Sequence, residues 1–415
     1  MAPSQINFAG LMFASSFGRL LFVSANRKSL KLENLLRETV AEATQREKTE
    51  FDRLAGGTKP IVLFGAGGLG RRTLAGLRKY GVRPVAFADN SSAAWGRDIE
   101  GVPVLSPKDA AAKFGKNGIF VVTIWGAFGK DRMRDRINQV RQLGCDNVVS
   151  FGPLYWKYPD GLVPHYSVEL PHKVLEEKDR IREAYALWAD DASREEFLAH
   201  LQWRLKMDFD VLAQPMKHPI YFPHDLLQLS DEEVFVDCGA FDGDSAKLFI
   251  NECGGKYRKI VAFEPDPMNF AKLQENAKTW PGGPGKTLLM QAATGAQRGK
   301  IRMMAAGNKS SAVGQGDVEV DLLTLDESLK GLAPTYLKMD IEGAEMDTLE
   351  GAANVIRDHA PVLTISAYHR QNDLWNIPLL IRSLNSSYRF YLRPHDLEVW
   401  DTVCYAIPAK RLKHS

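Results

Sequence analysis

Cysteine is scarce in this sequence: only Cys145, Cys238, Cys253 and Cys404 occur in 415 residues. They are scattered and show none of the short cysteine and histidine spacings that hold zinc. This scarcity argues against a disulfide scaffold or a zinc module. It predicts reduced thiols in a cytoplasmic protein and no metal centre built on cysteine.

An excess of charge of either sign is also missing. The 53 basic and 51 acidic residues leave a formal net charge of +2. Nucleic-acid binding domains concentrate basic residues in a patch or stripe, and none stands out here. We therefore expect no nucleic-acid partner.

No apolar run is long enough to cross a bilayer. The stretch from Phe8 to Val23 is interrupted by Ser15-Ser16 and Arg19, and no basic segment precedes it. A transmembrane helix needs about 20 predominantly apolar residues, and a signal peptide begins with a basic segment. We expect no membrane insertion and interpret this stretch as a docking segment or a poorly ordered extension.

The length of the chain favours two or three domains, because single hydrophobic cores stop growing at about 250–300 residues. Periodicity divides the sequence into an N-terminal extension with an amphipathic helix (1–58), a small Rossmann-like domain (59–154), a helical connector (155–228) and a second α/β domain (229–409). The helix of the extension is expected over Leu30–Leu54, ending at Gly56-Gly57, and could pair two chains in a homo-oligomer.

The first α/β domain carries a dinucleotide-type fingerprint. Gly65, Gly67 and Gly70 follow the apolar run Ile61–Phe64 and open a helix, and Asp89 ends the next strand. Such a turn brings backbone amides close to phosphates, and the acidic residue can accept ribose hydroxyls. The interpretations left open are NAD, a nucleotide-sugar or other nucleotide, and a scaffold without a ligand. No Tyr-x-x-x-Lys hydride-transfer set appears, and the domain resembles small Rossmann-like modules of sugar-modifying enzymes.

Further strands of this domain are predicted at Val85–Ala88, Ile119–Ile124 and Val148–Phe151. The connector shows helical periodicity over Glu169–Ala213, enough for about two helices, with a helix start near Asp191-Ala192-Ser193.

The second α/β domain alternates strands and helices. Its predicted strands are Val234–Asp237, Ile260–Glu264, Thr287–Gln291, Ile301–Met304, Tyr336–Asp340, Val362–Ser366, Arg389–Leu392 and Val403–Ile407. The short loop before the last strand implies an antiparallel hairpin at the edge of the sheet. The predicted fold class is α/β: two Rossmann-like parallel-sheet domains joined by a helical connector, the C-terminal one with the class I methyltransferase arrangement.

Polar residues in this domain gather where strands end. Asp237, Gly239 and Gly243 follow one strand, and Glu264 ends the next, where a carboxylate can accept both hydroxyls of a ribose. Asp244 or Ser245 can cap the helix that follows the glycine turn.

Two more motifs reach the same sheet edge. Asp340 and Glu342 follow a third strand, and Tyr368-His369 follows a fourth. Ligands of open α/β sheets bind at the carboxyl ends of the strands, so we expect these side chains to surround one site.

Together, these motifs resemble the FkbM family of methyltransferases, over about Glu233 to Ile407. The motifs are Gly239-Ala240-x-x-Gly243-Asp244, Phe263-Glu264-Pro265, Leu337-Lys338-x-Asp340-Ile341-Glu342-Gly343-x-Glu345 and Tyr368-His369. Asp242 departs from the family pattern, which is expected to have an apolar residue there.

The resemblance implies an S-adenosylmethionine-dependent O-methyltransferase acting on a hydroxyl of a sugar, polyketide or related metabolite. It implies cofactor contacts from Asp237, just before the first motif, and from residues in the first three motifs: Gly239, Ala240, Gly243, Asp244, Glu264 and Asp340. Adenine is expected near Ala292-Ala293.

Methyl transfer to an alcohol needs a group that takes the hydroxyl proton. His369 is the preferred candidate, because imidazole titrates near neutral pH; the alternative is a structural histidine. Asp340 and Glu342 compete for the role, or hold the methionine amino group or acceptor hydroxyls. Two close carboxylates can also bind a divalent metal, but spacing reveals no third ligand and no metal is predicted.

The acceptor is expected to be a small molecule, carbohydrate-linked in the interpretation we favour. Candidate pocket loops are Ala306–Gly316 and Pro281–Gly285, and Tyr368, Arg370 and Trp375 could contact a sugar. Two competing functions remain: an NAD-dependent oxidoreductase or epimerase using the first domain, and a non-catalytic nucleotide-binding scaffold.

Overall fold

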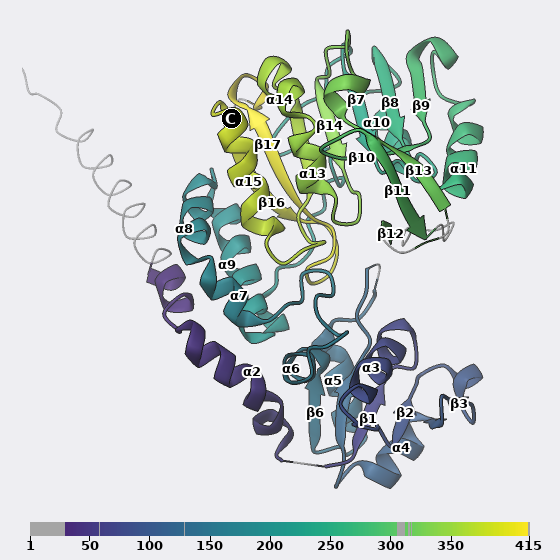
Figure 1. Ribbon diagram of the computed structural model, residues 1–415, viewed down its shortest axis with the longest axis vertical. Helices are drawn as coiled ribbons and strands as arrows, with labels where there is room; N and C mark the ends of the chain where they lie inside the picture. The colour runs from purple at the N-terminus through teal and green to yellow at the C-terminus, as the bar shows by residue number, and fades with distance from the viewer. Residues whose placement is uncertain are drawn as a thin grey trace, which may run out of the picture.

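The computed structural model describes residues 30–57, 59–127, 129–304, 312–313, 316 and 318–413. The Phe8–Val23 stretch and most of the Ala306–Gly316 loop lie outside these residues. Two α/β units are stacked along the long axis of the molecule, with helices between them (Figure 1). Among the described residues, no helix is both long and apolar enough to cross a membrane.

The N-terminal unit is a six-stranded sheet of order β3-β4-β2-β1-β5-β6, parallel except for β3. Its strands are β1 (Ile61–Phe64), β2 (Ala86–Ala88), β3 (Asp98–Ile99), β4 (Val102–Leu105), β5 (Ile119–Val122) and β6 (Asn147–Ser150). Its helical segments are α3 (Gly68–Arg78), η1 (Ser92–Ala94), α4 (Pro107–Phe114), α5 (Met133–Gln142) and α6 (Phe151–Lys157). The strands β1 and β5 are fully buried apolar runs, as parallel strands covered on both faces require.

The N-terminal helix is interrupted, contrary to the single helix expected over Leu30–Leu54. Residues 30–35 are helical, and α2 (Val40–Ala55) starts afresh. The reason is a capping box: the Thr39 side chain accepts from the Glu42 amide while the Glu42 carboxylate accepts from the Thr39 amide. As expected, Gly56 ends α2, in the left-handed conformation.

Three helices, not two, form the connector. They are α7 (Pro171–Glu176), α8 (Lys178–Leu187) and α9 (Asp191–Lys206), followed by η2 (Phe209–Val211). Asp190, one residue before the expected cap, accepts the Ser193 amide and starts α9. Trp203 of α9 packs in the core of the first sheet, and Leu201 packs in the core of the second, so one helix belongs to both cores.

The C-terminal unit has a seven-stranded sheet of order β16-β17-β15-β14-β7-β8-β9, in which β17 runs antiparallel to both of its neighbours and the remaining pairs are parallel. The strands are β7 (Val234–Cys238), β8 (Lys259–Phe263), β9 (Thr287–Met290), β14 (Tyr336–Met339), β15 (Val362–Ser366), β16 (Tyr388–Pro394) and β17 (Thr402–Pro408). This order and the reversed strand confirm the class I methyltransferase arrangement and the edge hairpin.

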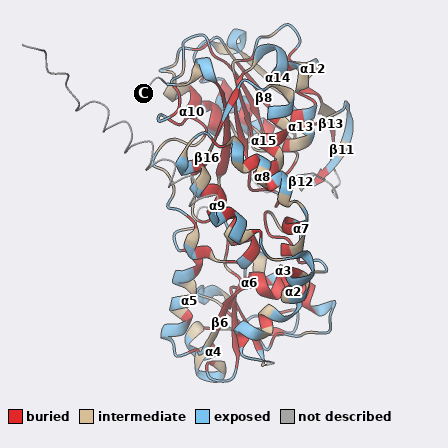
Figure 2. Cartoon of the chain, turned by 90° about the vertical axis from the view of Figure 1, so that its left-hand side faces the viewer, coloured by how far each residue is buried: buried red, intermediate tan, exposed pale blue. Residues whose placement is uncertain are grey.

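Helices cover the faces of this sheet (Figure 1). The helical segments are α10 (Asp244–Glu252), α11 (Pro267–Ala277), η3 (Gly283–Lys286), α12 (Leu325–Ser328), α13 (Glu345–Glu350), α14 (Ala353–His359), α15 (Asp373–Leu384) and η4 (Ala409–Arg411). Buried residues concentrate in the strands of both large sheets and in the helices between them (Figure 2).

A second, four-stranded sheet corrects one prediction. The strand expected at Ile301–Met304 exists, but it pairs within a separate sheet of order β10-β13-β11-β12. These strands are β10 (Ala292–Thr294), β11 (Gly299–Met304), β12 (Ala312–Val313) and β13 (Val318–Leu323). The physical reason is burial: β11 is largely exposed and β13 is only partly buried, whereas strands in the middle of the large sheet are covered on both faces.

Candidate active site

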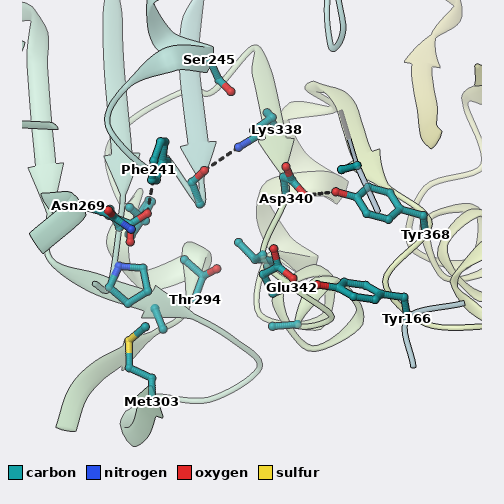
Figure 3. Close-up of a pocket in the computed structure, with 18 of the residues that line it drawn as sticks. Tyr166, Phe241, Ser245, Asn269, Thr294, Met303, Lys338, Asp340, Glu342 and Tyr368 are labelled. Carbon is teal, nitrogen blue, oxygen red and sulfur yellow. Dashed lines mark hydrogen bonds between the residues drawn. The ribbon is translucent and has the colours of Figure 1, made fainter. Parts of the chain in front are cut away.

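One cavity of about 1300 Å³ lies between the two units, at the carboxyl ends of strands from both. On the C-terminal side its wall includes Gly239, Phe241, Asp244, Glu264, Ala292, Ala293, Lys338, Asp340 and Glu342. On the other side it includes Gly68, Leu69, Trp125, Gly126, Ala127, His165 and Tyr166. Figure 3 shows side chains from both sides pointing into it.

The turn after β7 needs glycine at two positions. Gly239 has φ +80°, and a Cβ there would lie 2.0 Å from the carbonyl oxygen of Asp340. Gly243 has φ +92°, and a Cβ there would lie 2.7 Å from the Trp280 ring. Glycine is the residue that adopts this left-handed backbone at little cost and has no Cβ to clash with these neighbours. The backbone of the turn can therefore lie close to a ligand in the cavity.

Glu264 connects the turn to the next loop. One carboxylate oxygen accepts the Phe241 amide at 2.8 Å and the other accepts the Asp266 amide at 2.9 Å. Burial raises the pKa of Glu264 to about 7, although both amides oppose this shift. A carboxylate has about four acceptor positions, so it can also receive ribose hydroxyls from the cavity.

Asp237 departs from its predicted role as a direct cofactor contact. Its side chain is fully buried, with one oxygen 3.0 Å from Nζ of Lys338, and it does not line the cavity. Lys338 also donates to the carbonyl oxygen of Gly239 at 2.7 Å. Burial alone would lower the pKa of Lys338, but Asp237 and other carboxylates outweigh it and hold the pKa above its usual value. The buried pair therefore stabilises the glycine turn through the hydrogen bond from Lys338 to Gly239.

The sequence assigned no role to Lys338, although its motif was recognised. A lysine in a buried strand was the available signal, because such a residue requires a partner. Among the predicted cofactor residues, Gly239, Asp244, Glu264 and Asp340 line the cavity, whereas Asp237, Ala240 and Gly243 do not.

His369 lies among three carboxylates. Its Nδ1 is 2.8 Å from Glu345, and its Nε2 is 3.4 Å from Asp340 and 3.9 Å from Glu342. Burial would lower the pKa of His369, but these carboxylates, Glu345 foremost, raise it to about 10. The ring is therefore protonated at neutral pH, which argues against the expected role of His369 as the base.

Glu342 is the carboxylate of this cluster with a pKa suited to proton transfer. Burial, with Asp340 and Glu345 nearby, raises its pKa to about 7 although His369 opposes the shift. Its backbone has φ +55°, an unfavourable value for a residue with a side chain and one that is often found at functional sites. In Figure 3 the side chains of Glu342 and Tyr166 point toward one another across the cavity.

Asp340 is held ionised. Tyr221 donates to one oxygen at 2.9 Å and Tyr368 to the other at 3.5 Å. Burial would raise the pKa of Asp340, but Lys338 and His369 lower it below its usual value. Asp340 therefore supplies a constant negative charge beside Glu342.

Glu345 is the third partner that sequence spacing did not reveal. Side-chain atoms of Asp340, Glu345 and His369 lie within 4.8 Å of one another, a distance compatible with a shared cation. The protonated ring of His369 supplies a positive charge within this cluster itself. The prediction that the site holds no metal stays a prediction.

The glycine turn of the N-terminal unit resembles the turn after β7. Gly65 has φ +119°, and a Cβ on Gly70 would lie 1.9 Å from the Gly65 carbonyl oxygen. Asp89 accepts the Ala66 amide at 2.7 Å with one oxygen and the Ser91 amide at 2.8 Å with the other. Asp89 thus bridges a glycine turn and the following loop, as Glu264 does.

Three predicted acceptor features have different outcomes. Tyr368 lines the cavity, whereas the Pro281–Gly285 loop does not. Trp375 is fully buried, and its indole N–H donates to Glu177 at 2.8 Å, so it packs in the core instead of contacting a sugar.

The fold and the site define a protein with a class I methyltransferase domain. Residues 237–395 match the family model described as the methyltransferase FkbM domain. This confirms the resemblance seen in the motifs.

Two known proteins are similar over different lengths. The hexuronic acid methyltransferase AglP of Haloferax volcanii is 25% identical over 139 residues, which are 32% of this chain and 55% of that protein. The chain thus spans about half the length of this curated relative. The crystal structure of methyltransferase FkbM from Methylobacillus flagellatus KT matches with a TM-score of 0.71 and 24% identity, over 89% of this chain and 99% of the other. The likeness extends over both α/β units and shows a shared fold.

Proposed function

We propose that this protein is an S-adenosylmethionine-dependent O-methyltransferase that acts on a hydroxyl of a sugar or a secondary metabolite. The observation that carries the proposal is the cavity that joins the Gly239 turn and Glu264 to the carboxylate cluster around His369. The family match supports the methyltransferase activity, and the similarity to a hexuronic acid methyltransferase supports a sugar acceptor.

The residues present fit S-adenosylmethionine. Glu264 would hold the ribose, Ala292 and Ala293 would lie near the adenine, and the backbone at Gly239 leaves room for the amino-acid part. Asp340 and Glu342 would attract the positive charges of the cofactor. When bound, it supplies an electrophilic methyl group on a positively charged sulfur.

Glu342 is the proposed base. An ionised Glu342 accepts the hydroxyl proton while the acceptor oxygen gains the methyl carbon and the carbon–sulfur bond breaks, leaving its electron pair on sulfur. A base with a pKa near the working pH is well matched to this step. Asp340 and protonated His369 fix the charge around Glu342 and are positioning residues.

The carboxylates also select the acceptor atom. A carboxylate acceptor would approach Asp340 and Glu342 against like charge, whereas a neutral hydroxyl would not. We therefore propose methylation of a hydroxyl group.

Calorimetric titration with S-adenosylhomocysteine tests the cofactor site. We expect saturable binding that Glu264→Ala weakens about 10- to 100-fold, because a hydrogen bond to a charged group contributes about 1.5–3 kcal/mol. Glu275→Ala, an exposed glutamate of α11, is the matched control and should bind normally. Absence of binding together with clear NAD binding would favour the oxidoreductase alternative.

Turnover should depend on pH through Glu342. Because its pKa is raised to about 7 and the ionised form is active, the rate at saturating substrates should rise as pH increases through about 7. His369→Gln removes a positive charge that lowers this pKa, so the rise should move to higher pH. A pH profile identical in both proteins would argue against this arrangement.

A further inference from the structure

The cavity is shared by both α/β units. Gly68 and Leu69 begin α3, Trp125 and Gly126 follow β5, and all four line the same space as Glu342. Ligand pockets usually measure about 300–1,000 Å³, and this cavity of about 1300 Å³ is larger. It has room for an acceptor between the cofactor site and the N-terminal unit.

Aromatic rings line this space between the units. The Trp400 ring lies 4.6 Å from that of Trp125 and 4.8 Å from that of Tyr166, between centroids, and all three line the cavity. Flat rings of this kind suit the C–H faces of a sugar. Trp400 is 6% exposed, and its buried indole N–H has no hydrogen-bond partner among the described residues. This unpaired donor belongs to a residue of the cavity wall.

The two ends of the space differ in charge. Asp340, Glu342 and Asp401 make the C-terminal side acidic, so an anionic group would avoid it. At the opposite side is the N-terminus of α3, an 11-residue helix whose free amides favour an anion. A Cβ on Gly67 or Gly68 would meet no atom within 4 Å, so contacts within the protein do not explain why these residues are glycine.

We propose that the acceptor is a phosphorylated sugar that spans the two units. Its ring lies against Trp400 and Tyr166 with a hydroxyl toward Glu342, and its phosphate lies over Gly67 and Gly68. This inference rests on the proposed methyltransferase function and gives the N-terminal unit the task of holding the acceptor.

A nucleoside diphosphate is one source of the phosphate, and a simple glycosyl phosphate is the other. Asp89, at the tip of β2, holds its glycine turn as Glu264 does. The Trp95 side chain beside it is 44% exposed, and its indole N–H donates to the Asp89 carbonyl oxygen at 2.7 Å. An exposed ring beside a ribose-type carboxylate would suit a nucleoside.

Calorimetry on the full chain saturated with S-adenosylhomocysteine tests the proposal with pyrophosphate, UDP and NAD as probes. We expect pyrophosphate and UDP to bind, and Gly68→Asp to weaken them by about tenfold or more through charge repulsion. This variant should fold normally, because its side chain enters open space and an acidic residue suits the first turn of a helix. Gly285→Asp, at an exposed glycine away from the cavity, is the matched control.

The relative affinities of the probes distinguish the two phosphate sources and test the proposal itself. UDP binding more tightly than pyrophosphate supports a nucleoside diphosphate sugar, and equal binding supports a glycosyl phosphate. Equal effects of the two variants, no binding of either phosphate, or NAD binding more tightly than UDP would overturn the proposal. If S-adenosylhomocysteine itself does not bind, the methyltransferase proposal fails instead.

Discussion

Replacing Glu342 with glutamine should lower kcat about 100- to 10,000-fold, the usual contribution of a positioned general base. The amide keeps the shape of the side chain but cannot take the hydroxyl proton. Affinity for S-adenosylhomocysteine, whose sulfur is uncharged, should change little, because Glu264, Asp340 and the Gly239 turn remain intact. Single-turnover and steady-state rates with a methyl acceptor would measure the effect.

The control for this variant is Glu350→Gln, which changes an exposed glutamate at the end of α13. Its kcat should equal that of the wild type. A Glu342→Gln protein that kept full kcat would remove Glu342 as the base and return His369 and Asp340 to consideration. Lost S-adenosylhomocysteine binding would instead place Glu342 in the cofactor site.

Replacing Lys338 with methionine should destabilise the protein by about 3–5 kcal/mol, the usual cost of leaving one partner of a buried ion pair alone. Lys338 is 2% exposed, Asp237 is fully buried, and both face the cofactor turn. Urea denaturation, with the midpoint and slope compared, would measure the loss.

The double variant Asp237→Asn/Lys338→Met should recover part of that stability, since no unpaired charge remains. Lys300→Met, which removes a lysine from the exposed pair with Glu319, should have little effect. If the single and double variants were equally unstable, the loss would come from packing and not from the charge of Asp237.

Most of the large sheets was predictable, because their central strands are short apolar runs between glycine or acidic turns. The smaller elements were not. The two-residue β3 is too short to show a period, and β4 contains a proline. The strand β13, with the sequence VEVDLL, does alternate, and that signal was overlooked.

The sequence predicted which residues of the site follow strand ends. It did not predict which side chains of the site contact one another. Glu264, Asp340 and Glu342 could be located because each follows a strand. That Glu345 would bind His369, 24 residues away, depends on how α13 packs beside α15, the helix that follows His369. Trp125 and Trp400 meet only after two units have assembled, and no local pattern encodes such a contact.

The helix α9 has a consequence for how the protein unfolds. Because Trp203 and Leu201 of this helix lie in different cores, neither sheet can lose its packing without exposing apolar surface of the other. A hydrogen bond also connects the two units: Glu398, in the loop before β17, accepts the Met133 amide of α5. The two sheets should therefore unfold together in one cooperative transition, and not in two separate transitions. A destabilising substitution in either unit would lower the melting temperature of both.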